Sequence, residues 1–246
     1  MGKNYVEADG SPFFTKISWF VKKYGLFCSF MKLFRRTFAP IILPFVPNRI
    51  FNFDNKTYNF FHRKYNETWI NERAVEIPLV MDYVKKHEGK SILEFGNVLS
   101  HYFNSDWDIV DKYEKGKNVI NKGIFDYEPG KKYDLIVSIS TLEHLGIEGD
   151  IFPDKFNGID SYIIDTFAKL KSLLNKKGEL IITVPVGYNR YLDRLINENK
   201  LGIEMRFLKR IKKYSWGEVD KGEALKTRFG KPYPYGNCIM IGRFVN

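Results

Sequence analysis

The stretch SILEFGNVLSHY, residues 91–102, decides the fold. Its first five residues form a short, mostly apolar run, which is typical of a strand buried inside a sheet. Gly96 follows at once, and glycine is common where a strand turns sharply into the next segment. The stretch therefore predicts a buried strand that ends in a tight turn.

The same pattern continues toward the carboxyl terminus. Further strands are predicted at residues 107–110, 119–124, 133–140 and 179–184, and a long helix at 161–174. Two last strands, at 203–208 and 238–244, have no long helix between them, so we expect them to be antiparallel. Strands that alternate with helical stretches indicate an α/β fold. We predict a seven-stranded, mostly parallel sheet with helices on both faces and an N-terminal helical extension.

The chain before residue 88 has a different character. Residues 13–24 place aromatic and aliphatic side chains on one side of a helical wheel and lysines on the other. A second apolar stripe follows Gly25, and a further helix is predicted at 69–86, interrupted at Pro78. We divide the chain into a basic amphipathic extension at 1–50, a helical lid or linker at 51–89, and a core domain at 90–246.

Composition and length limit the classes of protein. The 246 residues are 44% hydrophobic and 28% charged, which is ordinary for a globular chain and excludes a disordered or collagen-like polymer. The two cysteines cannot build a disulfide scaffold. The longest apolar run, residues 39–46, is broken by Pro40 and Pro44, so no membrane-spanning helix is expected. The polar start does not resemble a secretion signal, and we expect a cytoplasmic protein.

The net charge of +10 is concentrated at the amino terminus, where the first 50 residues hold eight Lys and Arg against two acidic residues. Three interpretations stay open. Residues 13–36 could bind an anionic membrane surface from the cytoplasmic side. They could pack on the core or on a second copy in a homodimer. They could bind nucleic acid, although the sequence contains no recognised DNA- or RNA-binding motif. We favour the membrane.

In an open parallel sheet, ligands bind beyond the carboxyl ends of the strands. The residues at these ends are therefore the candidates for a site. They are Glu94, Gly96 and Asn97 after the first strand, Asp111 and Lys112 after the second, Asp126 after the third, Ser140, Glu143 and His144 after the fourth, and Tyr188 and Asn189 after the fifth.

Over residues 90–246, and best between 91 and 189, the chain resembles the class I S-adenosylmethionine-dependent methyltransferases. Glu94 and Gly96 match the start of the family's acidic-x-Gly-x-Gly-x-Gly turn, whereas Val98 and Ser100 replace its second and third glycines. Asp111 matches the acidic residue that holds the ribose hydroxyls in that family. Asp126 likewise matches the acidic residue that faces the adenine.

The resemblance implies S-adenosylmethionine as cofactor. Its ribose and its adenine amine donate hydrogen bonds, which suits carboxylates, and its tail carboxylate suits backbone N–H groups of a turn. Asn97, Lys112 and Ser140 are expected beside these contacts. The strings NVLSHY (97–102) and VDKYE (110–114) also resemble a branch assigned to glycan or cell-surface modification. That branch implies O-methylation of a sugar hydroxyl in a surface glycan or its lipid-linked precursor.

His144 is the candidate general base because imidazole titrates near neutral pH, and Glu143 would tune it. A histidine that only caps a helix is the alternative. Arg73, Tyr188, Asn189 and Tyr233 are predicted to contact the acceptor, which is a glycan or a small molecule. No metal is expected, because Ser140 stands where metal-dependent relatives of this family carry an acid.

Two further functions stay open. A small-molecule or RNA methyltransferase would use the same cofactor site. A catalytically silent methyltransferase-like module is suggested by Val98 and Ser100, since the lost glycines leave less room for a cofactor. Asp111 could then do no more than cap its own turn.

Overall fold

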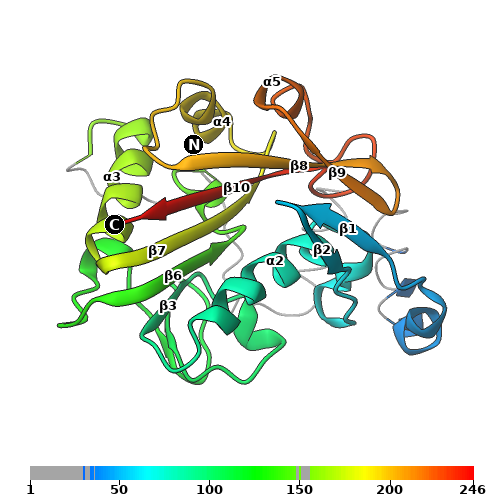
Figure 1. Ribbon diagram of the computed structural model, residues 1–246, viewed down its shortest axis with the longest axis horizontal. Helices are drawn as coiled ribbons and strands as arrows, with labels where there is room; N and C mark the ends of the chain where they lie inside the picture. Colours follow the sequence, from blue (N-terminus) through cyan, green and yellow to red (C-terminus); the bar gives the residue numbers. More distant parts are fainter. Residues whose placement is uncertain (1–29, 31–33, 36, 148–149, 151–155) are drawn as a thin grey trace.

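The computed structural model describes residues 30, 34–35, 37–147, 150 and 156–246. Its centre is a sheet in the order β5-β4-β3-β6-β7-β10-β8-β9 (Figure 1). The strands are β3 (Ile92–Phe95), β4 (Asp108–Val110), β5 (Val119–Ile120), β6 (Tyr133–Ile139), β7 (Leu174–Pro185), β8 (Glu204–Lys212), β9 (Ser215–Val219) and β10 (Cys238–Val245).

The five strands from β3 to β7 are parallel, and the predicted α/β class is confirmed. β10 lies antiparallel between β7 and β8, which confirms the expected antiparallel end of the sheet. The sheet has eight strands instead of seven, because β9 folds back on β8. In β9 the buried Trp216 stands between exposed or half-buried neighbours, a strand signal too short to recognise in the sequence.

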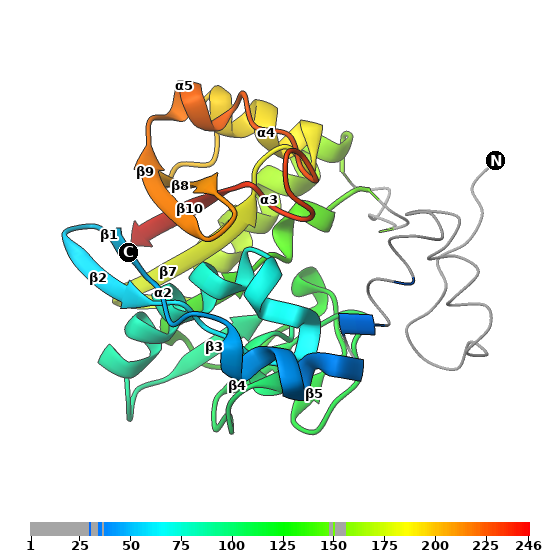
Figure 2. The ribbon, with the colours of Figure 1, turned by 90° about the vertical axis from the view of Figure 1, so that its right-hand side faces the viewer.

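Helices cover both faces of the sheet (Figures 1 and 2). α3 (Ile159–Ser172) and α4 (Arg190–Asn197) pack on one face, against the side of β6 that carries Ile136. α2 (Arg73–Lys86) packs on the other face, against Leu135, Val137 and Ile139 of the same strand. A short helix, α5 (Lys221–Ala224), follows β9. Because successive residues of a strand point to opposite faces, one apolar strand supplies both cores.

Pro78 lies inside α2 without interrupting it, in contrast to the sequence prediction. A proline in a helix leaves the carbonyl four residues earlier without its usual donor. Here that carbonyl belongs to Ala74, and it accepts a hydrogen bond from the backbone N–H of Phe61 at 2.9 Å. The loop before the helix therefore replaces the missing bond.

The range 51–89, expected to be helical, begins with a hairpin instead. β1 (Ile50–Phe53) and β2 (Lys56–Asn59) pair around Asp54 and Asn55, both of which have positive φ. Such a turn matches the right-handed twist of the two strands. Phe51 and Phe53 are buried against the part of the core formed by α2, β8, β9 and β10. The hairpin therefore packs on the same face of the sheet as α2.

Much of the predicted N-terminal extension lies outside the described residues, including the whole amphipathic stretch 13–24. Of the rest, residues 37–42 are helical and continue into the 3₁₀ helix η1 (Leu43–Phe45). Among the described helices, none is both long and apolar enough to cross a bilayer.

Candidate functional site

A pocket of about 480 Å³ opens at the carboxyl ends of the parallel strands. The chain runs from β3 outward to β5 and then returns to β6 on the other side of β3, so the strand order reverses at the pocket. This is where ligands bind in open α/β sheets. Of the predicted site residues, the structure brings together Gly96, Asn97, Asp111, Lys112, Ser140, His144 and Arg73 around this pocket.

Gly96 allows two of these walls to approach each other closely. Its φ is +89°, a conformation that favours glycine, and a Cβ atom built there would lie 2.0 Å from Thr141 Oγ1. Any side chain at this position would collide with the loop after β6. Gly96 therefore lets the turn after β3 pack directly against Thr141 in the loop after β6.

Glu94 has a different place from the one predicted, because it does not line the pocket. Its buried carboxylate accepts hydrogen bonds from the backbone N–H groups of Val98 (2.7 Å) and Leu99 (2.6 Å), and from Trp107 Nε1 (3.0 Å). Burial raises its pKa, and these bonds counteract the rise. Glu94 shapes the turn from below, where the 3₁₀ helix η3 (Leu99–His101) begins.

This arrangement corrects one expectation about the turn. Backbone N–H groups of this turn were expected to suit a ligand's carboxylate, yet Glu94 already binds those of Val98 and Leu99. The turn thus has fewer donors to offer than a glycine-rich turn would have.

Asp111 ties the two neighbouring turns together. Its Oδ2 accepts from the N–H of Asn97 at 3.1 Å, and its Oδ1 accepts from the N–H groups of Tyr113 (2.8 Å) and Glu114 (2.6 Å). A carboxylate has about four acceptor positions, and the bonds within the described part of the chain use three of them. Asp111 caps its own turn, as the structural alternative held, and lines the pocket as well.

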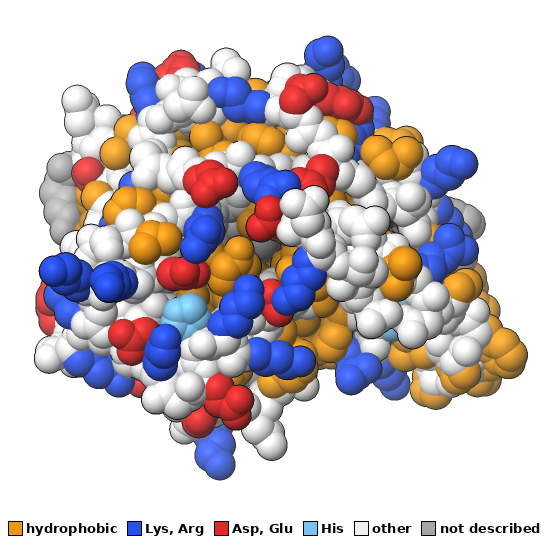
Figure 3. Space-filling view, viewed as in Figure 1, with side chains coloured by type: hydrophobic (Ala, Val, Ile, Leu, Met, Phe, Trp, Pro, Cys, Tyr) orange, Lys and Arg blue, Asp and Glu red, His pale blue; other side chains and the backbone are white. Residues whose placement is uncertain are grey.

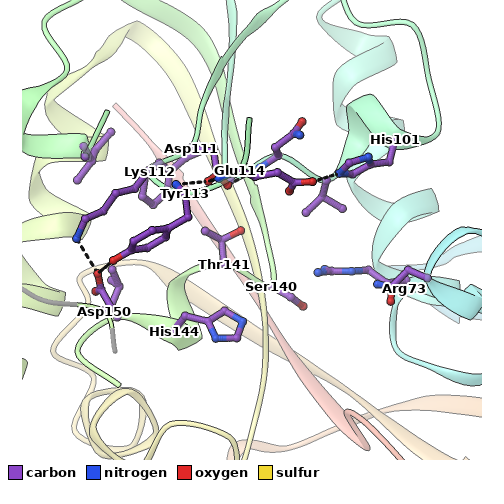
Figure 4. A pocket seen from close by; sticks show the side chains of 18 of the residues that line it. Arg73, His101, Asp111, Lys112, Tyr113, Glu114, Ser140, Thr141, His144 and Asp150 are labelled. Atoms are coloured by element: carbon purple, nitrogen blue, oxygen red, sulfur yellow. Dashed lines mark hydrogen bonds and ion pairs between the residues drawn. The ribbon is translucent and has the colours of Figure 1, made fainter. Parts of the chain in front are cut away.

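Two charged pairs stand on the walls of the pocket (Figure 4). Lys112 Nζ lies 2.9 Å from Asp150 Oδ1, which also accepts from the hydroxyl of Tyr113 at 2.7 Å. His101 Nε2 lies 2.7 Å from Glu114 Oε1, and this contact is the main reason that the pKa of His101 is raised. These pairs keep the wall polar near Asp111.

Arg73 points into the pocket from the first turn of α2, on the side opposite Lys112 and Asp150 (Figure 4). Its Nη1 donates to Glu76 Oε2 at 3.0 Å, and the fully buried Glu76 accepts from Ser140 Oγ at 2.7 Å. Burial raises the pKa of Glu76, and Arg73 counteracts this. One of five guanidinium N–H groups is thereby used, and the fork is held at the pocket by α2.

His144 lies in the 3₁₀ helix η5 (Leu142–His144) and borders the same space. Its Nε2 is 3.7 Å from Glu143 Oε1, and its Nδ1 is 3.3 Å from the hydroxyl of Tyr188. Glu143 is buried, which raises its pKa to about 7, and among the described residues its Oε2 has no hydrogen-bond partner. Glu143 and Tyr188 therefore contact the histidine rather than the pocket.

Asn189 supports this loop from outside the pocket. Its side-chain amide donates to the carbonyls of Glu143 (2.9 Å) and Leu145 (3.0 Å), and its oxygen caps the first turn of α4. The sequence prediction placed it against the acceptor, whereas the structure places it beneath the loop that carries His144.

Two predicted residues lie away from the pocket. Asp126 is exposed at the end of η4 (Ile124–Asp126) and does not line the pocket. The apolar Ile124 of the same turn lines it instead. Tyr233 packs its ring against Arg210, with the guanidinium carbon 5.5 Å from the ring centre. In the described part of the chain, no cluster of three or more His, Cys, Asp or Glu could hold a metal ion.

The sequence reading missed several lining residues. Tyr65 and Asn66 belong to the 3₁₀ helix η2 (Tyr65–Ile70), His101 ends η3, and Tyr102, Glu114 and Asp150 come from loops. His101, Tyr102 and Glu114 lie in the strings NVLSHY and VDKYE but were not assigned to the site. Tyr65, Asn66 and Asp150 carry no motif, because they reach the pocket through turns whose path depends on tertiary contacts. Glu76 carried a signal that was overlooked, since an acid in the apolar stretch 74–80 needs a buried partner.

Comparisons with known proteins found no matching family model and no matching curated protein. Solved structures with a similar arrangement include the N-methyltransferase NodS from Bradyrhizobium japonicum WM9 in complex with S-adenosyl-L-homocysteine, at 12% identity over 64% of this chain and 78% of that chain, with a TM-score of 0.38. Another is the 1,6-didemethyltoxoflavin-N1-methyltransferase of Burkholderia thailandensis, at 13% identity over 75% and 83%, with a TM-score of 0.43. Similarity this low does not identify the reaction, which has to be inferred from the pocket.

Proposed function

We propose that this chain is an S-adenosylmethionine-dependent methyltransferase. The observation that supports it most is the position of Gly96, Asp111 and Ser140, each directly after a parallel strand, around one pocket at the point where the strand order reverses. The volume of about 480 Å³ is within the range of cofactor and ligand sites.

The residues present fit the parts of this cofactor. Asp111 has an acceptor position for a ribose hydroxyl, and Ile124 and Tyr162 offer apolar surface for a flat base. The tail carboxylate would be bound by Arg73, because Glu94 occupies the nearby turn amides. The bound sulfonium would supply an activated methyl group, so the chain needs only to align an acceptor and accept its proton.

The acceptor would lie between His144 and the aromatic wall of Tyr65 and Tyr102. His144 is half-exposed, borders the pocket and can accept a proton, and Tyr188 and Glu143 hold its ring. We propose a hydroxyl of a sugar as the acceptor, in a surface glycan or its lipid-linked precursor, because aromatic faces stack on sugar rings and a hydroxyl needs a base. A small molecule or an RNA is the alternative.

Calorimetry with S-adenosylmethionine and S-adenosylhomocysteine tests the cofactor. We expect saturable binding that is weakened at least about tenfold in Asp111→Asn, since a charge-assisted hydrogen bond is lost. Asp106→Asn is the matched control, because Asp106 does not line the pocket. Absence of heat at millimolar cofactor would contradict the proposal.

The acceptor is tested by the formation of S-adenosylhomocysteine with oligosaccharides, small amines, phenols and RNA oligonucleotides. Turnover with an oligosaccharide that falls at least about 100-fold in His144→Gln supports a sugar hydroxyl and a general base. If only RNA or a small molecule is methylated, the proposal of a sugar acceptor is wrong, whereas the proposal of methyltransferase activity stands.

One observation favours a catalytically silent module as the second candidate. Glu94 binds two amides of the turn after β3, and this turn carries Val98 and Ser100 where the resembled family has glycines. A module of this kind would bind S-adenosylhomocysteine weakly or not at all and would turn over none of the acceptors. The calorimetry separates the two.

A further inference from the structure

The most exposed apolar surface of the described chain lies on its N-terminal segment. Phe34, Phe38, Ile41 and Phe45 are 41%, 41%, 63% and 82% exposed. A spacing of four, three and four residues is typical of one face of a helix. Phe38 and Ile41 lie in the helical residues 37–42, and Phe45 ends the 3₁₀ helix η1 that follows. Figure 3 shows hydrophobic side chains gathered at this corner of the molecule. We call these four side chains the aromatic stripe.

The stripe is held in place by its opposite side. Ala39 is fully buried, and Arg35 Nε lies 3.0 Å from Glu67 Oε1 of η2. The segment is thus anchored to the same 3₁₀ helix whose Tyr65 and Asn66 line the pocket. In Figures 1 and 2 it lies on the side of the molecule to which the parallel strands point their carboxyl ends. The stripe faces away from the body and stands close to the pocket wall.

The sequence around the stripe holds cations and no acids, and Glu67, which contacts the segment from η2, is paired with Arg35. No Asp or Glu occurs between Asp9 and Asp54, while seven Lys and Arg do. At the end of the segment, the guanidinium of Arg49 lies 5.0 Å from the ring centre of Tyr214, beside the exposed Lys212 and Lys213. Aromatic side chains bordered by cations suit the interface of an anionic bilayer, which takes up the rings and attracts the charge.

We infer that the aromatic stripe, with Arg49, Lys212 and Lys213, docks this protein on the surface of an anionic lipid bilayer. A second copy is a poorer occupant, because two such surfaces would bring like charges together. The inference does not depend on the proposed reaction, since binding to lipid needs neither cofactor nor acceptor.

Vesicle sedimentation with the full-length chain tests the docking. Vesicles of phosphatidylcholine with about one third phosphatidylglycerol are compared with pure phosphatidylcholine, at low and at high salt. We expect the chain to bind the anionic vesicles, and high salt to weaken that binding. The double variant Ile41→Glu with Phe45→Glu should bind at least about tenfold more weakly, because two apolar side chains leave the interface. Both residues are exposed, so the fold should persist.

The matched control is Val245→Glu, which changes a 49% exposed apolar residue at the carboxyl end of the chain. For the charge, Arg49, Lys212 and Lys213 are changed to Gln together and compared with the same change at the exposed Lys85, Lys90 and Lys176. The first set should weaken binding several-fold and the second should not.

Three outcomes would overturn the inference. The wild type fails to bind anionic vesicles, or it binds them equally after the stripe is changed. The third is that analytical ultracentrifugation shows the wild type to be a dimer that does not bind vesicles, and shows the stripe variant to be a monomer. Calorimetry with S-adenosylhomocysteine on the same variants keeps the two proposals apart, because cofactor binding should be unchanged in all of them.

Discussion

At the scale of single residues, the site is determined by which backbone amides are already bound. Glu94 occupies the N–H groups of Val98 and Leu99, and Asp111 occupies those of Asn97, Tyr113 and Glu114. The acids after β3 and β4 were recognised in the sequence, but their partners could not be. An acid at this position of the sequence can point its carboxylate into its own turn or out toward the pocket. The path of the loop decides between the two, and the sequence does not reveal that path.

Arg73 is the residue whose role follows from these bonds. If it binds the tail carboxylate, Arg73→Gln should bind S-adenosylhomocysteine about 10- to 100-fold more weakly, the value of one or two charge-assisted hydrogen bonds. Methylthioadenosine, which lacks the amino acid tail, should bind wild type and variant alike. Calorimetry with both ligands measures the difference. If the affinity for both ligands falls equally, then Arg73 supports the structure of the pocket and does not bind the tail carboxylate.

Glu143 makes the stability depend on pH. Burial raises its pKa from 4.5 to about 7 in the folded chain, so the folded state holds its proton more firmly than the unfolded state does. The free energy of unfolding from this group is therefore highest below pH 4.5 and falls as the pH rises to about 7.

We expect the variant Glu143→Gln to lack this decrease in the free energy of unfolding with rising pH. Urea unfolding of both chains between pH 4.5 and pH 8 measures it, and the difference in stability, wild type minus variant, should decrease over that range and level off near pH 7. A difference that is flat, or that rises with pH, would mean that Glu143 is ionised throughout.

At the scale of elements, the parallel part of the fold was predictable and the N-terminal part was not. β3, β6 and residues 180–185 of β7 are nearly continuous apolar runs, because both of their faces are buried. The hairpin of β1 and β2 was missed because each strand has four residues and its turn lacks glycine. The uninterrupted α2 could not be foreseen either, since Phe61 supplies the bond that Pro78 removes.

Asn189 links two elements, α4 and the loop of His144. Asn189→Ala removes the helix cap and leaves the carbonyls of Glu143 and Leu145 without their donor. We expect a loss of about 2–3 kcal/mol in the free energy of unfolding, from the cap and the buried carbonyls together. Turnover should fall about tenfold while cofactor affinity changes less than about twofold, because only the His144 loop moves.

Urea unfolding and steady-state kinetics measure both effects. Asn197→Ala, at the exposed end of the same helix, is the control. If cofactor affinity falls as much as turnover, then Asn189 supports the whole pocket and not the histidine loop.

At the scale of the whole molecule, one proposed ligand would contact the loops that follow three strands of the sheet, β3, β4 and β6. Hydrogen exchange can follow all of them at once. With S-adenosylhomocysteine at about 100 times its dissociation constant, the folded state should gain about 2.7 kcal/mol. The ligand would contact the loops after β3, β4 and β6, so their amides should exchange more slowly when it is bound. The hairpin of β1 and β2 does not line the pocket, so exchange through local opening of the hairpin should be unaffected. Slower exchange at the loop after β3 alone would show that the acids after successive strands do not serve one nucleoside, and the shared pocket would then be a consequence of the topology and not of a cofactor.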